Sequence, residues 1–281
     1  GGTVPISLKQ TWEETEPSTY LLDQAYGSGA AAAYSTRQLR NAQTDCMVIR
    51  RISDGTTETI GFDGSGNIDE AAIEAFCTGT DCRVSSWIDQ SGNGNNATQT
   101  NANAQPVIYT VGAIVKQNGK PALNGVGSND QLNLDSTISF TGNFSHYLLQ
   151  TFQTNDMPYG GAAGHFWFHQ NNSTLRYRLS GATEQYLGYN FTTSQRFLSS
   201  GNRGLVSGNL MLAVDGVANS AQNPSTETFD VSMIFNGNGG GYNYDGKLQE
   251  FVMYNSSKNA TDQTSIEENI GDYFTQNTPL L

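Results

Sequence analysis

The chain has 281 residues, of which 36% are hydrophobic and only 14% are charged. Its 13 Tyr, 13 Phe and 3 Trp can form a sizeable core, which argues against a disordered chain. The formal net charge is −12, and no cluster of Lys and Arg occurs beyond Arg50-Arg51. Since phosphates attract clustered cations, nucleic acid is excluded as an expected partner. A membrane is not expected either, because no run approaches the roughly 18 apolar residues of a span.

The beginning of the chain differs from the rest. Residues 1–19 show no clear periodicity and are predicted to form an extended N-terminal arm that docks on the domain or on a neighbour. No change of composition and no Pro/Ser-rich linker divides the remainder. Residues 20–281 are therefore predicted to form one domain.

Four elements are predicted in the first part of this domain. The Ala-rich stretch 29–40 consists of good helix formers and predicts a short helix. Two strand-like runs, 47–52 and 58–62, flank a turn that contains Asp54-Gly55. A second helix is predicted over 67–76, because its apolar residues fall on one stripe and acidic residues occupy its first turn.

From about residue 106 onward, short strands recur every 8–15 residues, separated by turns rich in Gly and Asn. This spacing is typical of an all-β sandwich or jelly roll. A helix over 262–274 closes the chain, with Ile266 and Ile270 on one face. The clearest strands are predicted at 84–88, 144–152, 164–168, 175–179, 210–214, 231–235 and 248–254.

The number of cysteines is odd. Cys77 and Cys82 are close enough in sequence for a small disulfide loop with Gly79 at its turn. Cys46 precedes an apolar strand and is predicted to be a buried free thiol. The histidines lie far from the cysteines in sequence, so no metal site is predicted from these residue types.

Several blocks of the sequence resemble a known family. They are 32–39, 48–51, 66–77, Cys82 with 87–99, 244–253 and 266–270. The blocks are similar to the catalytic domain of α-L-arabinofuranosidase B, family 54 of the glycoside hydrolases. They also resemble laminin-G-like domains of bacteriophage virion proteins and bacterial surface proteins. The resemblance implies a concanavalin A-like (laminin-G-like) β-sandwich jelly roll with a few short helices, and it supports the Cys77–Cys82 disulfide.

The resemblance also bears on catalysis. Glycoside hydrolysis normally uses two carboxylates. The family's nucleophile is an Asp in the Gly-rich loop before the last strand, and alignment backwards from Gly246 puts Gly239 at that place. Glu184 is the candidate for the acid/base, although an exposed loop glutamate is the simpler interpretation. No catalytic residue is therefore assigned, and hydrolysis is not expected.

Sugar binding uses aromatic platforms flanked by amide hydrogen-bonding groups. The alternative interpretation is that the aromatic residues fill the core and the asparagines shape turns. The candidate glycan-binding residues are Tyr186, Tyr189, Asn190, Asn238, Tyr242 and Tyr244, and Phe191, Asn236 and Asn243 supply further material of the same kind.

The loop that begins at Asp89 allows two interpretations. Asp89, Asn93 and Asn95 carry oxygens that suit Ca²⁺, but the ordered ligand series of an EF-hand loop is missing. Hydrogen bonds between backbone amides of a tight turn and the side chains of Asp89 and Asn93 are the simpler interpretation. No cofactor is therefore expected, with calcium as the alternative.

These observations lead to a functional hypothesis. The chain is predicted to be a non-enzymatic virion surface protein of a bacteriophage, such as a capsid decoration, head-fibre or tail component. It would be located on the virion or outside the cell, and would form oligomers with other virion or surface chains through the arm. Host polysaccharide is a further expected partner. The alternatives are a secreted carbohydrate-binding lectin domain and an arabinofuranosidase-like glycoside hydrolase.

Overall fold

The computed structural model of the chain describes most of the predicted domain. The arm predicted for residues 1–19 lies outside the described residues. The described ranges are 20–126, 129–151, 157–161, 166–170, 174–178, 185–188, 194–206, 209–218, 222–224, 228–237 and 242–274.

The elements up to residue 126 are short strands and one α-helix. In chain order they are η1 (Leu21–Asp23), β1 (Ala30–Ser35), β2 (Asp45–Arg51), β3 (Thr57–Gly61), α1 (Glu70–Phe76), β4 (Cys82–Trp87), β5 (Ala97–Thr98), η2 (Ala102–Ala104), β6 (Val107–Thr110), β7 (Ala113–Ile114), β8 (Lys116–Gln117), β9 (Lys120–Pro121) and β10 (Leu123–Val126).

Longer strands and a C-terminal helix follow. They are β11 (Leu132–Phe140), β12 (Phe144–Thr151), β13 (Tyr159–Gly160), β14 (Phe166–Gln170), β15 (Thr174–Arg178), β16 (Gln185–Gly188), β17 (Arg196–Val206), β18 (Asn209–Val214), β19 (Val217–Ala218), β20 (Gln222–Pro224), β21 (Phe229–Ile234), β22 (Asn236–Gly237), β23 (Tyr242–Asn243), β24 (Asp245–Tyr254) and α2 (Ala260–Phe274).

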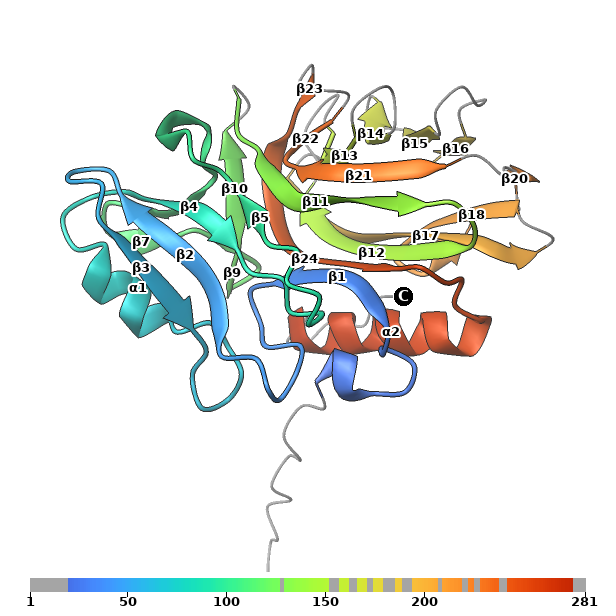
Figure 1. Cartoon of the computed structure of the whole chain (residues 1–281), viewed down its shortest axis with the longest axis horizontal. Helices are drawn as coiled ribbons and strands as arrows, with labels where there is room; N and C mark the ends of the chain where they lie inside the picture. Colours follow the sequence, from blue (N-terminus) through green and yellow to red (C-terminus); the bar gives the residue numbers. More distant parts are fainter. Residues whose placement is uncertain are drawn as a thin grey trace, which may run out of the picture.

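Strand β24 is the centre of an antiparallel sheet that curls over itself. It pairs with β12 on one edge and with β1 and β10 on the other. Beyond β12 the sheet continues into β17 and β18. Beyond β10 it passes through β6, β4 and β5 and returns as β11, β21, β13, β14, β15 and β16. The curl produces two stacked layers (Figure 1).

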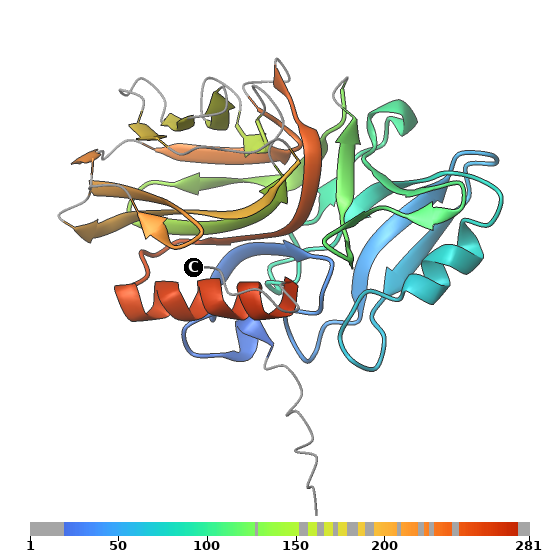
Figure 2. The same ribbon diagram turned by 180° about the vertical axis from the view of Figure 1, so that it is seen from behind.

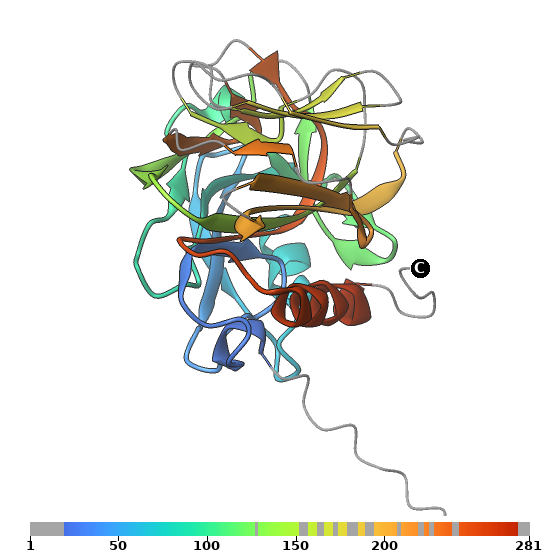
Figure 3. The same ribbon diagram turned by 90° about the vertical axis from the view of Figure 1, so that its right-hand side faces the viewer.

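We call β1, β12, β17, β18 and β24 the helix-side layer, and β11, β13, β14, β15, β16 and β21 the outer layer. Figure 3 shows the order from bottom to top: α2, the helix-side layer, then the outer layer. Aromatic rings fill the space between the layers, and the centroids of Tyr159 and Phe251 are 4.4 Å apart. Tyr177 and Phe229, at 4.8 Å, continue this packing.

The helix-side layer is buried on both faces. Because side chains alternate along a strand, Leu148 of β12 and Phe251 of β24 face the aromatic core between the layers. Their neighbours Tyr147 and Val252 face the opposite way, into a second core with Ile266 of α2. The helix therefore covers the face of the sheet that the outer layer does not.

Strands β2, β3 and β4, together with α1, form a lobe beside the two layers (Figures 1 and 2). Asp69 caps α1, since its carboxylate accepts the backbone N–H of Ala72 at 2.9 Å. A disulfide joins Cys77, just after α1, to Cys82 at the start of β4. This bond fixes the end of the helix to the lobe's sheet.

The prediction of a helix over residues 29–40 is wrong. Residues Ala30–Ser35 form strand β1, which pairs with β24 from Tyr254 to Glu250. Alanine favours a helix only when tertiary packing does not decide. Here Ala32 and Ala33 are fully buried on opposite faces of the strand, in the two different cores. Small side chains suit a strand that is covered on both sides.

Four other predicted elements have counterparts in the structure. The runs 47–52 and 58–62 are β2 and β3, while the predicted helices near 67–76 and 262–274 are α1 and α2. The predicted all-β sandwich with a few helices is confirmed. Among the described helices, none is long and apolar enough to cross a membrane.

Candidate functional site

The residues predicted to bind glycan lie mostly where side chains are not described. Tyr189, Asn190 and Asn238 lie outside the described residues. Glu184 and Gly239, which the catalytic argument used, do so as well. The side chains of Tyr186 in β16 and Tyr242 in β23 are not described either, although their backbones belong to those strands.

Tyr244 is the predicted glycan-binding residue whose side chain is described. It is fully buried, and its ring packs against Phe235 with centroids 5.9 Å apart. Its hydroxyl donates to the carbonyl of Thr151, and Thr151 Oγ1 in turn accepts the N–H of Lys247 at 2.9 Å. In this position Tyr244 joins the start of β24 to the end of β12 and offers no exposed ring face to a sugar.

Four amide side chains near this point form a continuous row, which we call the amide row: Gln131, Asn133, Asn236 and Asn243. Gln131 Nε2 donates to Asn133 Oδ1 at 3.1 Å, and Asn236 Nδ2 donates to Gln131 Oε1 at 3.4 Å. Asn236 Nδ2 also donates to Asn243 Oδ1 at 3.1 Å. The row therefore connects β11 with the β22–β23 hairpin.

Strand periodicity explains the direction of the amide row. Leu132 and Leu134 of β11 lie in the core. The residues between and before them, Asn133 and Gln131, must therefore project from the opposite face of the outer layer. Both are half-buried, whereas Asn236 is only 2% exposed. Gln131 and Asn133 were not among the residues predicted from the sequence. Their alternation with buried leucines was the signal that could have identified them.

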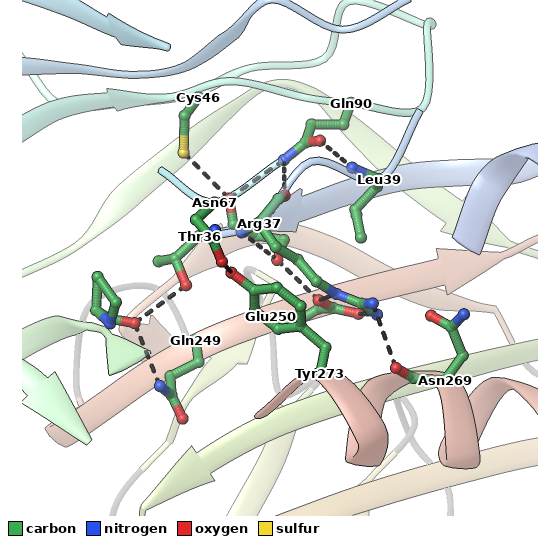
Figure 4. A network of polar contacts seen from close by, with 12 residues as sticks. Thr36, Arg37, Leu39, Cys46, Asn67, Gln90, Gln249, Glu250, Asn269 and Tyr273 are labelled. Atoms are coloured by element: carbon green, nitrogen blue, oxygen red, sulfur yellow. Dashed lines mark hydrogen bonds and ion pairs between the residues drawn. The ribbon is translucent and has the colours of Figure 1, made fainter. Parts of the chain in front are cut away.

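A buried ion pair lies on the other side of the molecule, next to α2 (Figure 4). Arg37 Nε and Nη2 donate to the two carboxylate oxygens of Glu250 at 2.7 and 2.9 Å, which is a bidentate arrangement. The hydroxyl of Ser35 donates to the same carboxylate at 2.7 Å. Glu250 is fully buried and Arg37 is 3% exposed, so substrate has no access to this carboxylate.

Helix α2 closes over this ion pair. Arg37 Nη1 donates to the carbonyl of Asn269 at 3.3 Å, and the guanidinium lies 5.1 Å from the ring centroid of Tyr273. The Tyr273 hydroxyl donates to Asn67 Oδ1 at 2.7 Å (Figure 4). The pair thus fastens β1 and β24 to the C-terminal helix, which is a structural role.

Gln90 satisfies the backbone next to the same pair. Its Oε1 accepts the N–H of Leu39 at 2.8 Å, and its Nε2 donates to the carbonyls of Ser35 and Arg37 at 3.2 and 3.0 Å. The predicted buried free thiol is confirmed: Cys46 is buried, and its Sγ donates to the carbonyl of Ser35. Burial raises the pKa of the Cys46 thiol, so it stays protonated and unreactive.

Asp89 organises the loop that follows β4. Its Oδ1 accepts the N–H groups of Ala33 and Ser91, both at 2.9 Å, and its Oδ2 accepts the N–H of Asn95 at 3.0 Å. The prediction that Asp89 bonds backbone amides is therefore confirmed. Asn93 behaves differently from the prediction, because its Nδ2 donates to backbone carbonyls, those of Ala30 and Ala31.

Calcium in this loop stays a prediction. Both carboxylate oxygens of Asp89 accept hydrogen bonds, so a cation here would have to replace them. Over the described ranges of the chain, no group of three or more His, Cys, Asp or Glu side chains is arranged to hold a metal ion.

One carboxylate beside the amide row has a shifted pKa. Desolvation raises the pKa of Asp130, although a hydrogen bond from the N–H of Val126 and the nearby charge of Arg83 act in the opposite direction. Arg83 Nη1 lies 3.6 Å from Asp130 Oδ1. A raised pKa suits a general acid, but Asp130 is 1% exposed and a sugar cannot reach it.

Sequence comparisons point to one family. Residues 22–123 match the family described as "Alpha-L-arabinofuranosidase B, catalytic". An α-L-arabinofuranosidase of Hypocrea jecorina is 44% identical over 75 residues, which are 26% of this chain and 15% of that protein. α-L-Arabinofuranosidase B of Aspergillus oryzae is 36% identical over 108 residues, covering 34% of this chain and 21% of that protein. The chain thus spans only a minor part of these relatives.

Solved structures extend the likeness beyond this stretch. An arabinofuranosidase complexed with arabinofuranosyl-α-1,2-xylobiose superposes with a TM-score of 0.66 and 20% identity, covering 86% of this chain and 62% of that chain. A variant of a family 54 α-L-arabinofuranosidase soaked with 4-nitrophenyl α-L-arabinofuranoside gives a TM-score of 0.67 and 21% identity, covering 91% and 65%. At this identity the likeness concerns the fold.

These comparisons correct the functional hypothesis. The predictions of a non-enzymatic bacteriophage virion protein and of virion partner chains held through an N-terminal arm are wrong, because the relatives are named as glycoside hydrolases. The hypothesis relied on Gly239, which lies outside the described residues, and on a resemblance to virion domains. The chain is similar to the catalytic domain of family 54 α-L-arabinofuranosidases, in sequence over residues 22–123 and in fold over most of its length.

Proposed function

We propose that the chain is an arabinofuranosidase-like glycoside hydrolase that acts on α-L-arabinofuranosides. The proposal depends on one observation: the similarity in sequence and the similarity in fold both lead to arabinofuranosidases. The sequence likeness covers residues 22–123, whereas the fold likeness covers 86–91% of the chain. The name of the activity comes from the relatives, and its transfer to this chain is the proposal.

The chemistry requires a proton donor and a second carboxylate on opposite sides of the glycosidic bond. Three described carboxylates are already committed to the fold or inaccessible. Glu250 pairs with Arg37, Asp89 accepts backbone N–H groups, and Asp130 is buried. Glu184 is the first candidate for the proton donor, on the resemblance alone.

The direct test is hydrolysis of 4-nitrophenyl α-L-arabinofuranoside, followed by the release of nitrophenolate. We expect turnover by the unmodified chain and a loss of at least a hundredfold in Glu184→Gln, since general acid catalysis contributes about 10²–10⁴-fold. Glu58→Gln, a change at an exposed strand residue, is the matched control and should keep full activity. Absence of turnover by the unmodified chain would contradict the proposal.

Sugar binding without hydrolysis is the second candidate function. The alignment that puts Gly239 in place of a nucleophile favours it, because glycine cannot attack an anomeric carbon. In that case an arabinose-bearing xylo-oligosaccharide should bind in a calorimetric titration while the aryl glycoside remains intact. No binding up to millimolar concentration would exclude this candidate.

An extracellular location accords with either function. The disulfide between Cys77 and Cys82 belongs in an oxidising compartment, since cytosolic thiols are kept reduced.

A further inference from the structure

We propose that the amide row, extended by Thr98, binds the neutral oligosaccharide chain that carries the sugar to be cleaved. This inference rests on the proposed function and deepens it, because it assigns the residues that would recognise the rest of the substrate. It adds Gln131, Asn133 and Thr98, which were not among the residues predicted to bind sugar.

Thr98 and two amides of the row share one face of the sheet. Asn133 is the direct partner of Thr98 in the antiparallel pair of β11 and β5. Side chains directly opposite each other in such a pair project from the same face of the sheet. Thr98, Asn133 and Gln131 therefore lie on the face of the outer layer that points away from the aromatic core. Thr98 and both amides are half-buried, so each still has contact with solvent.

The amide groups of the row are chemically complementary to the hydroxyl groups of a sugar. An amide side chain offers an acceptor oxygen and two N–H donors, and sugar hydroxyls both donate and accept. The Asn133 side-chain oxygen accepts a hydrogen bond from Gln131, and its Nδ2 group is suited to donate outward. The exposed acid nearby is Asp135, whose Oδ1 accepts from Thr98 Oγ1 at 3.3 Å. A net charge of −12 and this carboxylate disfavour an anionic ligand, so a neutral sugar fits best.

The side chains of the amide row are already ordered before a ligand binds. Each amide of the row is oriented by a hydrogen bond of 3.1–3.4 Å to a neighbouring amide. The Gln131 backbone is also fixed, because its N–H donates to Ala104 and its carbonyl accepts from Gln99. Groups that are already ordered lose little entropy when a ligand binds.

The test compares an arabinose-bearing xylo-oligosaccharide with the aryl arabinofuranoside. Asn133→Ala should weaken oligosaccharide binding about three- to tenfold by calorimetry, the range expected for one or two neutral hydrogen bonds. The conversion Asn133→Asp keeps the acceptor for Gln131 and removes the outward donor, so it should weaken binding similarly. Asn41→Ala, at an exposed residue of a distant loop, is the matched control and should bind like the unmodified chain.

The two proposals can fail separately. If the chain is an enzyme, Asn133→Ala should raise KM for the oligosaccharide by a larger factor than KM for the aryl arabinofuranoside, because the aryl substrate lacks the chain. Oligosaccharide binding that depends on Asn133 without any hydrolysis would support the amide row and contradict the hydrolase. No oligosaccharide binding, or equal binding by Asn133→Ala, Asn133→Asp and the unmodified chain, would overturn the inference even if aryl hydrolysis occurs. Equal weakening by Asn41→Ala would overturn it too.

Discussion

Two regions of the molecule are stabilised by different kinds of interaction. In residues 22–123, polar side chains connect backbone segments far apart in sequence: Asp89 accepts from Ala33, and Gln90 accepts from Leu39. In the sandwich that follows, the space between the layers is filled by aromatic rings such as Tyr159 and Tyr177. The family match in sequence covers the first region, whereas the second resembles its relatives in fold.

The difference has a physical basis. A side chain that satisfies several buried groups at once can rarely be replaced, because the abandoned groups would remain buried without partners. An aromatic core only requires the right volume and shape, and many combinations of side chains provide it. A sequence comparison therefore detects the first region more easily than the second, even when both keep the same fold.

The strongest test of this contrast is the buried ion pair, whose Arg37 belongs to the first region. Glu250→Gln leaves the Arg37 guanidinium buried without a counter-charge, so we expect the free energy of unfolding to fall by about 3–5 kcal/mol. Urea denaturation at pH 7 measures this. Glu268→Gln, at an exposed position of α2, is the control and should change stability little. A loss below about 1 kcal/mol would remove the energetic basis of the comparison.

A double variant sharpens the same point. Arg37→Met combined with Glu250→Leu removes both charges, and apolar replacements of a buried pair are often tolerated. We expect this variant to recover most of the stability that Glu250→Gln loses. If it does not, the contacts of the Arg37 side chain with Asn269 and Tyr273 matter more than the charge pair itself.

The sequence was informative about the fold for reasons that the structure makes clear. Turn residues and alternating runs identified β2, β3 and β24, because a strand with one or two apolar faces has a recognisable pattern. The Ala-rich β1 was mistaken for a helix, since its state is decided by pairing with β24, which lies more than two hundred residues away.

The candidate site was less predictable. Tyr244 looked like a sugar platform because nothing local distinguishes a buried tyrosine from an exposed one. The amide row depends on contacts between Gln131 and Asn236, which are separated by 105 residues in sequence. Such contacts arise from the curl of the sheet and leave no local pattern.

The disulfide tests the lobe of the first region. It closes a short loop, with the two cysteines separated by 5 residues, so loop-closure entropy predicts a stabilisation of about 2 kcal/mol. Cys77→Ser with Cys82→Ser should therefore lower the free energy of unfolding by about that amount, measured by urea denaturation. Cys46→Ser changes the free thiol alone and separates the effect of the bond from that of a buried sulfur atom. Equal losses in both variants would show that burial, not the bond, is responsible.

His146 tests the aromatic core of the second region. It is buried between Phe144, Tyr159 and Tyr177, and desolvation lowers its pKa to about 3. The unfolded chain binds this proton below about pH 6.5, whereas the folded chain does not, so stability falls as pH drops from 6.5 towards 3. The loss reaches about 2 kcal/mol at pH 5.

The measurement is the free energy of unfolding at pH 7 and pH 5 for the unmodified chain and for His146→Leu. The variant lacks the His146 contribution. Between pH 7 and pH 5 the free energy of unfolding of the unmodified chain should therefore fall by about 2 kcal/mol relative to that of His146→Leu. Taking the difference between the two free energies of unfolding cancels the contributions of the carboxylates, which both proteins share. These include Asp130 and Glu267, whose raised pKa values change stability in the opposite direction. A difference that is independent of pH would mean that the folded chain binds the His146 proton as readily as the unfolded chain does.

The smallest expected effect belongs to Tyr244 of the second region. Tyr244→Phe keeps the ring against Phe235 and removes the hydroxyl that donates to Thr151, so about 1 kcal/mol of stability should be lost. Tyr20→Phe, at a half-buried residue, is the control and should be nearly neutral. Oligosaccharide binding should remain unchanged in Tyr244→Phe, which is the reverse of the pattern expected for Asn133→Ala. Weakened binding at full stability would instead return Tyr244 to the sugar site and require the β22–β23 hairpin to open when sugar binds.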